Sequence, residues 1–240
     1  MVSDSNNIEF SLRLTFTIIL LLAQLLIALY LLIKINIKKK ERGRINFDFL
    51  FSFFILMICL SISLILYAHF NFNLTHFDPS NYHLYPYVFV WKLGSLISFI
   101  GYTVVLYIID KDMLEFRMKG FPAYIVLLVA ILQFLWPVSQ PEDFEFIATL
   151  GIVGNIVAIV IPINFFYIGK KTLGLRLAGY MIALGVLVYA IGSTLLGETI
   201  VMQLEVIFGT EIRVFLYILS LSLNIIGLIL AAYGVVKFSF

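Results

Sequence analysis

The chain has 240 residues, of which 62% are hydrophobic and 12% charged, and its formal net charge is +2. Soluble domains carry about 25% charged residues, so this composition excludes a protein whose whole surface faces water and indicates an integral membrane protein. The single cysteine, Cys59, excludes an intramolecular disulfide and a metal site built only from cysteines.

Seven apolar stretches are long enough to cross about 30 Å of hydrocarbon as helices. They are expected at residues 14–33, 49–68, 86–109, 120–136, 146–169, 177–197 and 214–236. The third carries Lys92 near its outer end, and we expect the amine to reach out to the lipid headgroups. The sequence therefore predicts an all-α membrane protein in which residues 1–240 form one seven-transmembrane-helix bundle.

The first stretch is expected to remain in the mature protein. A cleaved signal peptide has basic residues before its apolar core. Here the acids Asp4 and Glu9 come first, and the basic segment Lys34–Arg44 follows the core. This order predicts a retained helix whose N-terminus lies outside.

The basic residues alternate between loops along the chain. All of them except Arg13, Lys92 and Arg213 lie in the loops after the first, third and fifth stretches or near the C-terminus, whereas the other loops are acidic. Short loops rich in Lys and Arg stay on the cytoplasmic side. We therefore expect a multi-pass protein of the cell membrane, N-out and C-in, without room for a soluble catalytic or DNA-binding domain.

Two of the basic loops resemble each other. KKERGR at Lys39–Arg44 and KKTLGLR at Lys170–Arg176 share one offset with Gln24 and Asn155. This spacing fits a 3+1+3 arrangement of parallel repeats, which preserves the orientation of each helix. The alternative is that basic cytoplasmic loops resemble one another without any duplication.

Small residues recur at helical spacing in the last two stretches. Arg213, Ser220, Gly227 and Gly234 repeat every seven residues, and the sixth stretch repeats Ala178, Gly185 and Gly192. Packed faces inside membranes use small residues, so these faces are expected to point into the bundle. Between the two stretches, Glu198–Thr210 predicts a short interfacial helix with Ile200, Val201, Leu204, Ile207 and Phe208 on one face.

Several polar residues are expected near the middle of the bilayer. Their depth follows from their position in each stretch and a helical rise of about 1.5 Å per residue. They form hydrogen bonds that hold helices together, or they line a cavity for a ligand or solute. Pro162 frees a backbone carbonyl of its helix and is expected to kink it. The candidate ligand-binding residues are Gln24, Ser98, Gln133, Asn155, Pro162, Tyr189, Tyr217, Ser220 and Asn224.

Motifs for catalysis and metal binding are missing. A proton or sodium pump requires a carboxylate inside a membrane span, and none of the seven stretches contains one. The three histidines, His69, His76 and His83, lack the spacing of a zinc site. No HExxH, GxSxG or phosphate-binding loop is present. The sequence predicts no enzyme, no catalytic residue, no metal and no cofactor.

Two families share the expected architecture. In length and helix number the chain resembles microbial rhodopsins, but Ser220–Asn224 contains no lysine to hold retinal. The run Ile161–Tyr167 (IPINFFY), followed by Gly169-Lys170-Lys171 and Gly174-Leu175-Arg176, resembles prokaryotic seven-helix sensor modules that precede histidine kinases. That resemblance implies a receptor-like prokaryotic protein that signals through a partner, because no kinase follows Phe240. The 3+1+3 sugar transporters are another analogue, although their proline-glutamine signatures are missing.

Three functions remain open. The first is a sensor that binds a small ligand or lipid in the bundle and signals through a cytoplasmic or membrane partner. The second is an ion-uncoupled transporter of small solutes, and the third is a scaffold that binds anionic lipids. No nucleic-acid partner is expected. The residues expected to contact lipid or partner at the cytoplasmic face are Lys38, Lys39, Lys40, Arg42, Arg44, Lys170, Lys171 and Arg176.

Overall fold

The computed structural model describes residues 2–44, 46–195, 198–209 and 212–240, without the side chains of residues 2–9, 152–158, 198–200 and 202–203. Within these ranges all regular structure is helical. The α-helices are α1 (Val2–Arg42), α2 (Phe49–Ala68), α3 (Tyr87–Met113), α4 (Phe121–Leu135), α5 (Pro141–Leu150), α6 (Ile152–Lys171), α7 (Arg176–Thr194), α8 (Glu198–Phe208) and α9 (Ile212–Ser239). A π-helix (His69–Leu74) and two 3₁₀ turns (Pro79–Asn81, Leu173–Leu175) lie in the connections.

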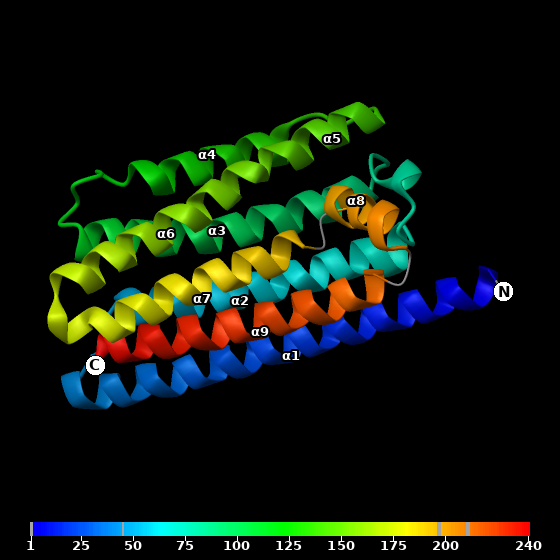
Figure 1. Ribbon diagram of the computed structural model, residues 1–240. Coiled ribbons are helices and arrows are strands. Elements are labelled where there is room, and N and C mark those ends of the chain that lie inside the picture. The colour runs from blue at the N-terminus through cyan, green and yellow to red at the C-terminus, as the bar shows by residue number, and fades with distance from the viewer. Residues whose placement is uncertain (1, 45, 196–197, 210–211) are drawn as a thin grey trace.

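The long helices lie side by side, and the chain turns back at each end of the bundle (Figure 1). Contacts run from α1 through α2, α3, α4, α6 and α7 to α9, and α9 in turn contacts α1. Each of these helices therefore packs beside the next one along the ring, and the first and last helices close it. The ring encloses an interior in which the candidate site lies.

Five helical segments of the described chain are long and apolar enough to cross a membrane. They are Phe10–Arg42, Phe49–Leu74, Tyr87–Met113, Leu173–Thr194 and Ile212–Ser239. Large apolar side chains such as Leu26 (66% exposed) and Leu128 (57% exposed) face outward, where lipid tails can cover them. The protein is a multi-pass integral membrane protein. The sequence also predicts that α4, which has 15 residues, and the α5–α6 pair cross the membrane. These two crossings remain predictions.

The basic segment after the first apolar stretch is helical and not a loop. α1 continues through Arg42, because Lys, Arg and Glu favour helix and the segment has no glycine or proline before Gly43. Gly43 has a φ of +74°, and its N–H donates to the Lys39 carbonyl oxygen at 2.8 Å. A glycine in the left-handed conformation ends many helices in this way.

The fifth expected stretch is interrupted at Gly151, which separates α5 from α6. The Gly151 N–H bonds to the Ala148 carbonyl oxygen, one residue nearer than in a regular α-helix. Pro162 lies further along, inside α6. The interruption at Gly151 leaves the Ile147 carbonyl free for a partner elsewhere in the bundle.

Lys92, which was expected to reach the headgroups, has a partner within the protein. It is buried, and its Nζ donates to the backbone carbonyl of Trp136, the residue that caps the C-terminal end of α4. The last carbonyls of a helix lack intrahelical partners and carry partial negative charge. This helix end therefore attracts the amine inward.

The small-residue faces of α7 and α9 pack against each other, as expected. A Cβ placed on Gly185 would lie 2.4 Å from Ala231 N, and one on Gly227 would lie 2.5 Å from Tyr189 N. Backbone atoms of the two helices are therefore in direct contact. This is the most extensive helix pair in the described chain.

Helix α8 confirms the short helix expected between the last two crossing helices. Of its expected apolar face, Val201 is buried, whereas Ile207 and Phe208 are exposed; the side chain of Ile200 lies outside the described residues. Glu205 pairs with Arg213, with Oε2 and Nη2 at 2.8 Å. This ion pair ties α8 to the first turn of α9.

Asp78 organises the connection between α2 and α3. Its carboxylate accepts hydrogen bonds from the Ser80 hydroxyl at 2.7 Å and from the Ser80 N–H at 3.0 Å. These bonds hold the pKa of the exposed Asp78 carboxyl below its ordinary value. They stabilise the start of the 3₁₀ turn at Pro79–Asn81.

Candidate functional site

A cavity of about 330 Å³ lies between the helices, and we call it the central cavity. Side chains from α1, α2, α3, α4, α5, α6, α7 and α9 line it. Cavities of about 300–1,000 Å³ with mostly apolar walls and a few polar groups are typical of small-molecule sites. The central cavity is at the lower end of this range.

No charged side chain lines the central cavity in the described part of the chain. Its polar lining consists of Gln24, Ser63, Tyr67, Ser95, Ser98, Tyr102, Gln133, Tyr189 and Ser193. Aromatic and aliphatic side chains make up the remainder, including Phe53, Phe99, Met57 and Ile182. The chemistry of the site is therefore hydrogen bonding and apolar contact, without ion pairing.

Three tyrosines from three helices meet in the central cavity. The hydroxyl of Tyr67 (α2) interacts with Ser63, Ser95 and Ser98, and the hydroxyls of Tyr102 (α3) and Tyr189 (α7) interact with each other. Tyr67, Tyr102 and Ser95 were not among the residues expected here from the sequence. For the two residues of α3 the available signal was spacing, because Ser95, Ser98 and Tyr102 recur at helical intervals on one face.

Gln24 projects from α1 into the central cavity, and its side chain is 2% exposed. Its Oε1 has no hydrogen-bond partner among the described residues. A buried polar atom without a partner is costly, and most such atoms in proteins are paired. Gln24 therefore has an unpaired acceptor beside a cavity that is lined mostly by apolar groups and hydroxyls.

Gln133 has a structural role instead. Its Oε1 accepts from the Ser95 hydroxyl, and its Nε2 donates to the Ile147 carbonyl oxygen at 2.7 Å. Gln133 thereby joins α3 and α4 to the carbonyl freed by the interruption at Gly151. Both ends of this amide are occupied, so its contribution is to hold the helices together.

A second cavity of about 350 Å³, the end cavity, lies toward the end of the bundle that carries the π-helix and α8. Arg13, Tyr217, Ser220 and Asn224 are among its lining residues. The Arg13 guanidinium lies 4.6 Å from the Phe77 ring centroid and 5.1 Å from that of Tyr217. This cavity therefore has a cationic, aromatic rim.

The two cavities adjoin. Leu20, Leu64 and Tyr67 line both of them. Two apolar side chains and one tyrosine therefore separate the central cavity from the end cavity.

Three phenylalanines pack together beside the central cavity, on the side away from the end cavity. The ring centroids of Phe49 (α2), Phe165 (α6) and Phe238 (α9) are 5.2–5.9 Å apart in each pair. Phe165 is fully buried, and Phe49 lines the cavity directly. We call these residues the phenylalanine cluster. It separates the central cavity from the end of the bundle that carries most Lys and Arg residues.

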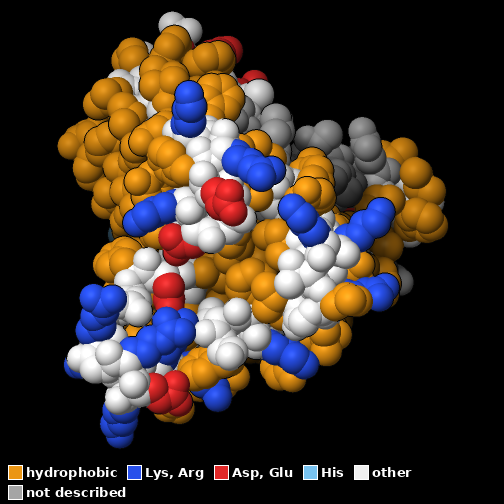
Figure 2. Space-filling view, turned by 90° about the vertical axis from the view of Figure 1, so that its left-hand side faces the viewer, with side chains coloured by type: hydrophobic (Ala, Val, Ile, Leu, Met, Phe, Trp, Pro, Cys, Tyr) orange, Lys and Arg blue, Asp and Glu red, His pale blue; other side chains and the backbone are white. Residues whose placement is uncertain are grey.

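That end of the bundle forms the basic face, and Figure 2 shows blue Lys and Arg side chains spread over it. The exposed members are Lys39, Lys40, Arg42, Arg44, Lys111, Arg117, Lys119, Lys170, Lys171, Arg176 and Lys237. Clusters of this kind near a membrane attract anionic headgroups. Seven of the eight residues expected to contact lipid or partner are in this set.

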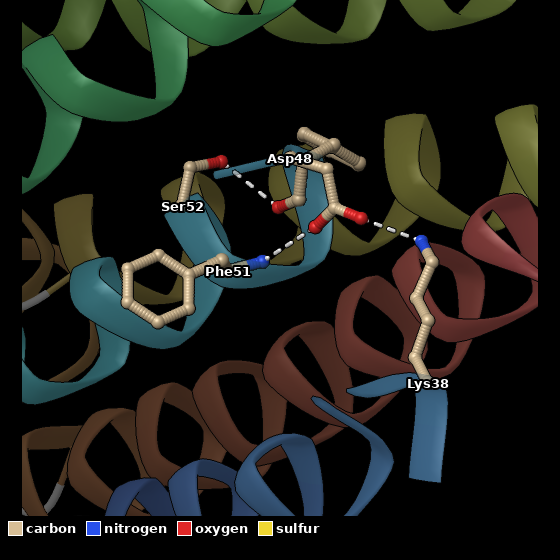
Figure 3. Close-up of polar contacts among 5 residues, drawn as sticks. Lys38, Asp48, Phe51 and Ser52 are labelled. Atoms are coloured by element: carbon tan, nitrogen blue, oxygen red, sulfur yellow. Dashed lines mark hydrogen bonds and ion pairs between the residues drawn. The ribbon is translucent and has the colours of Figure 1, made fainter. Parts of the chain in front are cut away.

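Lys38 is the exception, because its charge is used inside the protein. It is 9% exposed, and its Nζ lies 2.6 Å from Asp48 Oδ2 (Figure 3). Asp48 also caps α2, since its Oδ1 accepts from the Phe51 N–H at 3.2 Å. Lys38 therefore fixes the end of α1 to the start of α2 and is not available to a lipid or partner.

The expected midplane residues divide between the two cavities. Gln24, Ser98, Gln133 and Tyr189 line the central cavity, and Tyr217, Ser220 and Asn224 line the end cavity. Some also join helices: the Ser220 hydroxyl donates to the Gly192 carbonyl oxygen at 2.7 Å, and Ser193 donates to Asn224 Oδ1 at 3.1 Å. Pro162 is buried and lines neither cavity, and the Asn155 side chain lies outside the described residues.

Among the described residues, no three His, Cys, Asp or Glu side chains are grouped as a metal site would require. The chain matches no family model, and no curated protein or solved structure matches it. The class of the protein, a helical multi-pass membrane protein with an uncharged internal cavity, therefore rests on its own geometry.

Proposed function

We propose that this protein is a receptor-like sensor of the cell membrane, without enzymatic activity, that binds a small ligand or lipid in the central cavity. In this proposal it crosses the membrane seven times, N-out and C-in. The two crossings beyond the five long apolar helices are α4 and the α5–α6 pair. The basic face is then cytoplasmic, as its charge favours.

The position of the central cavity, between the end cavity and the phenylalanine cluster, is the observation that carries this proposal. The end cavity adjoins it through Leu20, Leu64 and Tyr67, whereas the phenylalanine cluster lies between it and the basic face. A ligand would enter from outside through the end cavity and stop above the cluster. Access from this side alone would suit a receptor.

The phenylalanine cluster also offers a route for the signal. Phe165 and Phe238 belong to α6 and α9, whose last turns carry Lys170, Lys171 and Lys237 on the basic face. A ligand that displaces Phe49 would shift these two rings, since packed aromatic groups have few alternative arrangements. The movement would reach the basic face, where an acidic partner would respond.

Cysteine labelling tests the direction of access. In a Cys59→Ala background, Ser98→Cys places a thiol in the central cavity, and a membrane-impermeant maleimide is applied to each side of sealed vesicles separately. The proposal expects labelling from outside only. Ser222→Cys is the matched control, because Ser222 is exposed on the outer surface of α9 and would face lipid. No labelling of Ser98→Cys from either side in a folded protein would refute the proposal.

A solute transporter without ion coupling is the second candidate, and it is favoured because none of the described side chains that line the central cavity is charged. Transport requires that the phenylalanine cluster open, so Ser98→Cys would then be labelled from both sides. Saturable uptake of solute into liposomes would support this candidate over the sensor.

A membrane scaffold is the third candidate, favoured by the exposed Lys39, Lys40 and Arg42. Each basic residue near an anionic surface contributes about 1 kcal/mol. Replacing these three by glutamine should then weaken retention of phosphatidylglycerol over phosphatidylcholine in the purified protein. Unchanged retention would count against the scaffold.

A further inference from the structure

The lining of the central cavity restricts the chemistry of what it can hold. In the part of the chain that the structure describes, none of the lining side chains is charged. An ion moved from water into such a space loses hydration and gains no partner. Anionic and cationic ligands are therefore disfavoured there, and an uncharged molecule is favoured.

The walls favour a largely apolar body. Phe49, Phe53 and Phe99 face the cavity together with Leu56, Met57 and Leu60. Aromatic side chains bind ring-shaped ligands through stacked or edge-to-face contacts. An aromatic or other compact apolar group of suitable size fits these walls.

Gln24 adds one directional requirement. Gln24 lines the cavity, the residue is 2% exposed, and its Oε1 is buried without a hydrogen-bond partner among the described residues, so a rotation of the amide turns this acceptor toward a bound molecule. A molecule that fills the cavity without offering a donor leaves this acceptor desolvated and unpaired, which weakens binding. A molecule with an O–H or N–H group satisfies it.

We infer that the central cavity binds an uncharged, mostly apolar small molecule with an O–H or N–H donor, and that Gln24 Oε1 accepts the hydrogen bond. The inference rests on the proposed function, since it names the class of ligand for the same cavity. Gln24 is the residue that distinguishes ligands with a donor from those of equal shape without one.

Indole and benzofuran provide a matched pair of probes. They have nearly the same size and shape, but only indole carries an N–H donor. Binding of each tritiated probe is measured to the full-length protein in nanodiscs, with empty nanodiscs subtracted to remove partition into lipid. Indole-3-carboxylate is tested as a charged competitor.

We expect saturable binding of indole, about tenfold tighter than that of benzofuran, as one hydrogen bond to a buried acceptor predicts. Gln24→Met should abolish this preference by removing the acceptor while keeping an apolar side chain of similar volume. The matched control is Leu22→Met, on the exposed side of the same helix, which should leave the preference unchanged. The carboxylate should not compete.

Equal binding of the two probes to the wild-type protein would overturn the inference. So would a preference that survives in Gln24→Met, competition by the carboxylate, or no saturable binding of indole. Labelling of Ser98→Cys from outside then distinguishes a failure of the inferred ligand class from a failure of the receptor proposal. If labelling persists, the receptor proposal stands and only the ligand class is wrong; if labelling is also absent, both are wrong.

Discussion

The side-chain amide of Gln133 lies 2.7 Å from the carbonyl oxygen of Ile147, and this hydrogen bond compensates for the interruption between α5 and α6. The Gly151 N–H would normally bond to the Ile147 carbonyl but bonds to the Ala148 carbonyl. A side chain from another helix therefore replaces the lost backbone donor. The interruption can persist inside the bundle because no carbonyl is left unpaired by it.

Gln133→Leu should lower the free energy of unfolding by about 1–3 kcal/mol, because it leaves the Ile147 carbonyl without a partner and removes the acceptor of the Ser95 hydroxyl. The measurement is thermal stability of the detergent-solubilised protein. Leu132→Ala is the control, on the exposed side of the same helix, and should have little effect. Equal effects of the two changes would contradict the structural role of Gln133.

Gly185→Ala should separate or unfold the α7–α9 pair. The new Cβ would lie 2.4 Å from Ala231 N, a backbone atom that cannot rotate away, and overpacking of this kind costs about 1–3 kcal/mol or more. Gly174→Ala is the matched control, since no atom lies within 4 Å of that Cβ. Size-exclusion profiles and melting temperatures compare the two variants. A stable Gly185→Ala protein would show that the helices pack differently.

Asp48→Asn separates the two roles of the Asp48 carboxylate. Asparagine is also a good N-cap, so the bond to the Phe51 N–H can persist while the charge opposite the buried Lys38 is lost. We expect a loss of about 1–3 kcal/mol in stability, because a buried charge is left unpaired. Asp48→Ala should cost more, since the cap is lost as well.

Lys38→Met removes the other partner of the Lys38–Asp48 ion pair and should destabilise the protein. Lys39→Met is the control, because Lys39 is exposed on the same helix, and it should not destabilise the protein. If both are neutral in thermal unfolding, the ion pair of Figure 3 does not hold α1 against α2.

Asp110→Ala should loosen the connection between α3 and α4. The buried Asp110 carboxylate accepts from the Met118 N–H at 2.9 Å and from the Gly120 N–H at 2.5 Å. These bonds hold a tight loop in which Glu115, Phe116 and Lys119 have positive φ values, a conformation that is unfavourable for such residues.

Trypsin cleavage after Arg117 and Lys119 should therefore become faster in Asp110→Ala. Asp112→Ala is the control, because Asp112 is exposed. The N-out, C-in orientation expects cleavage only in inside-out vesicles. Cleavage in right-side-out vesicles alone would show that the basic face is outside.

Local patterns predicted most of the helices well. The second expected stretch has the same bounds as α2, and the fourth has Gly120 and Trp136 as the caps of α4. Runs of apolar residues between glycine, proline and charged residues determine such bounds. The basic segment Lys34–Arg44 was expected to be a loop, but most of it is helical. Its charge indicates on which side of the membrane it lies, whereas helix propensity decides whether it forms a helix.

The site was predictable only in part. Polar residues at equal depth were identified, but depth does not say which of them pair. The side chains of Ser220 and Gln133 donate hydrogen bonds to backbone carbonyls of other helices. Gln24 Oε1, by contrast, has no hydrogen-bond partner among the described residues. This distinction depends on the rotation and spacing of several helices at once.

The sequence by itself therefore determined the class of the protein, the positions of its helices and the basic character of one set of turns. These properties follow from composition, chain length and local propensity. Only the tertiary structure decided that Phe49, Phe165 and Phe238 meet below a cavity and that Lys38 turns inward to Asp48. Both arrangements join residues that are distant in sequence or on different helices, and the packing of the whole ring brings them together.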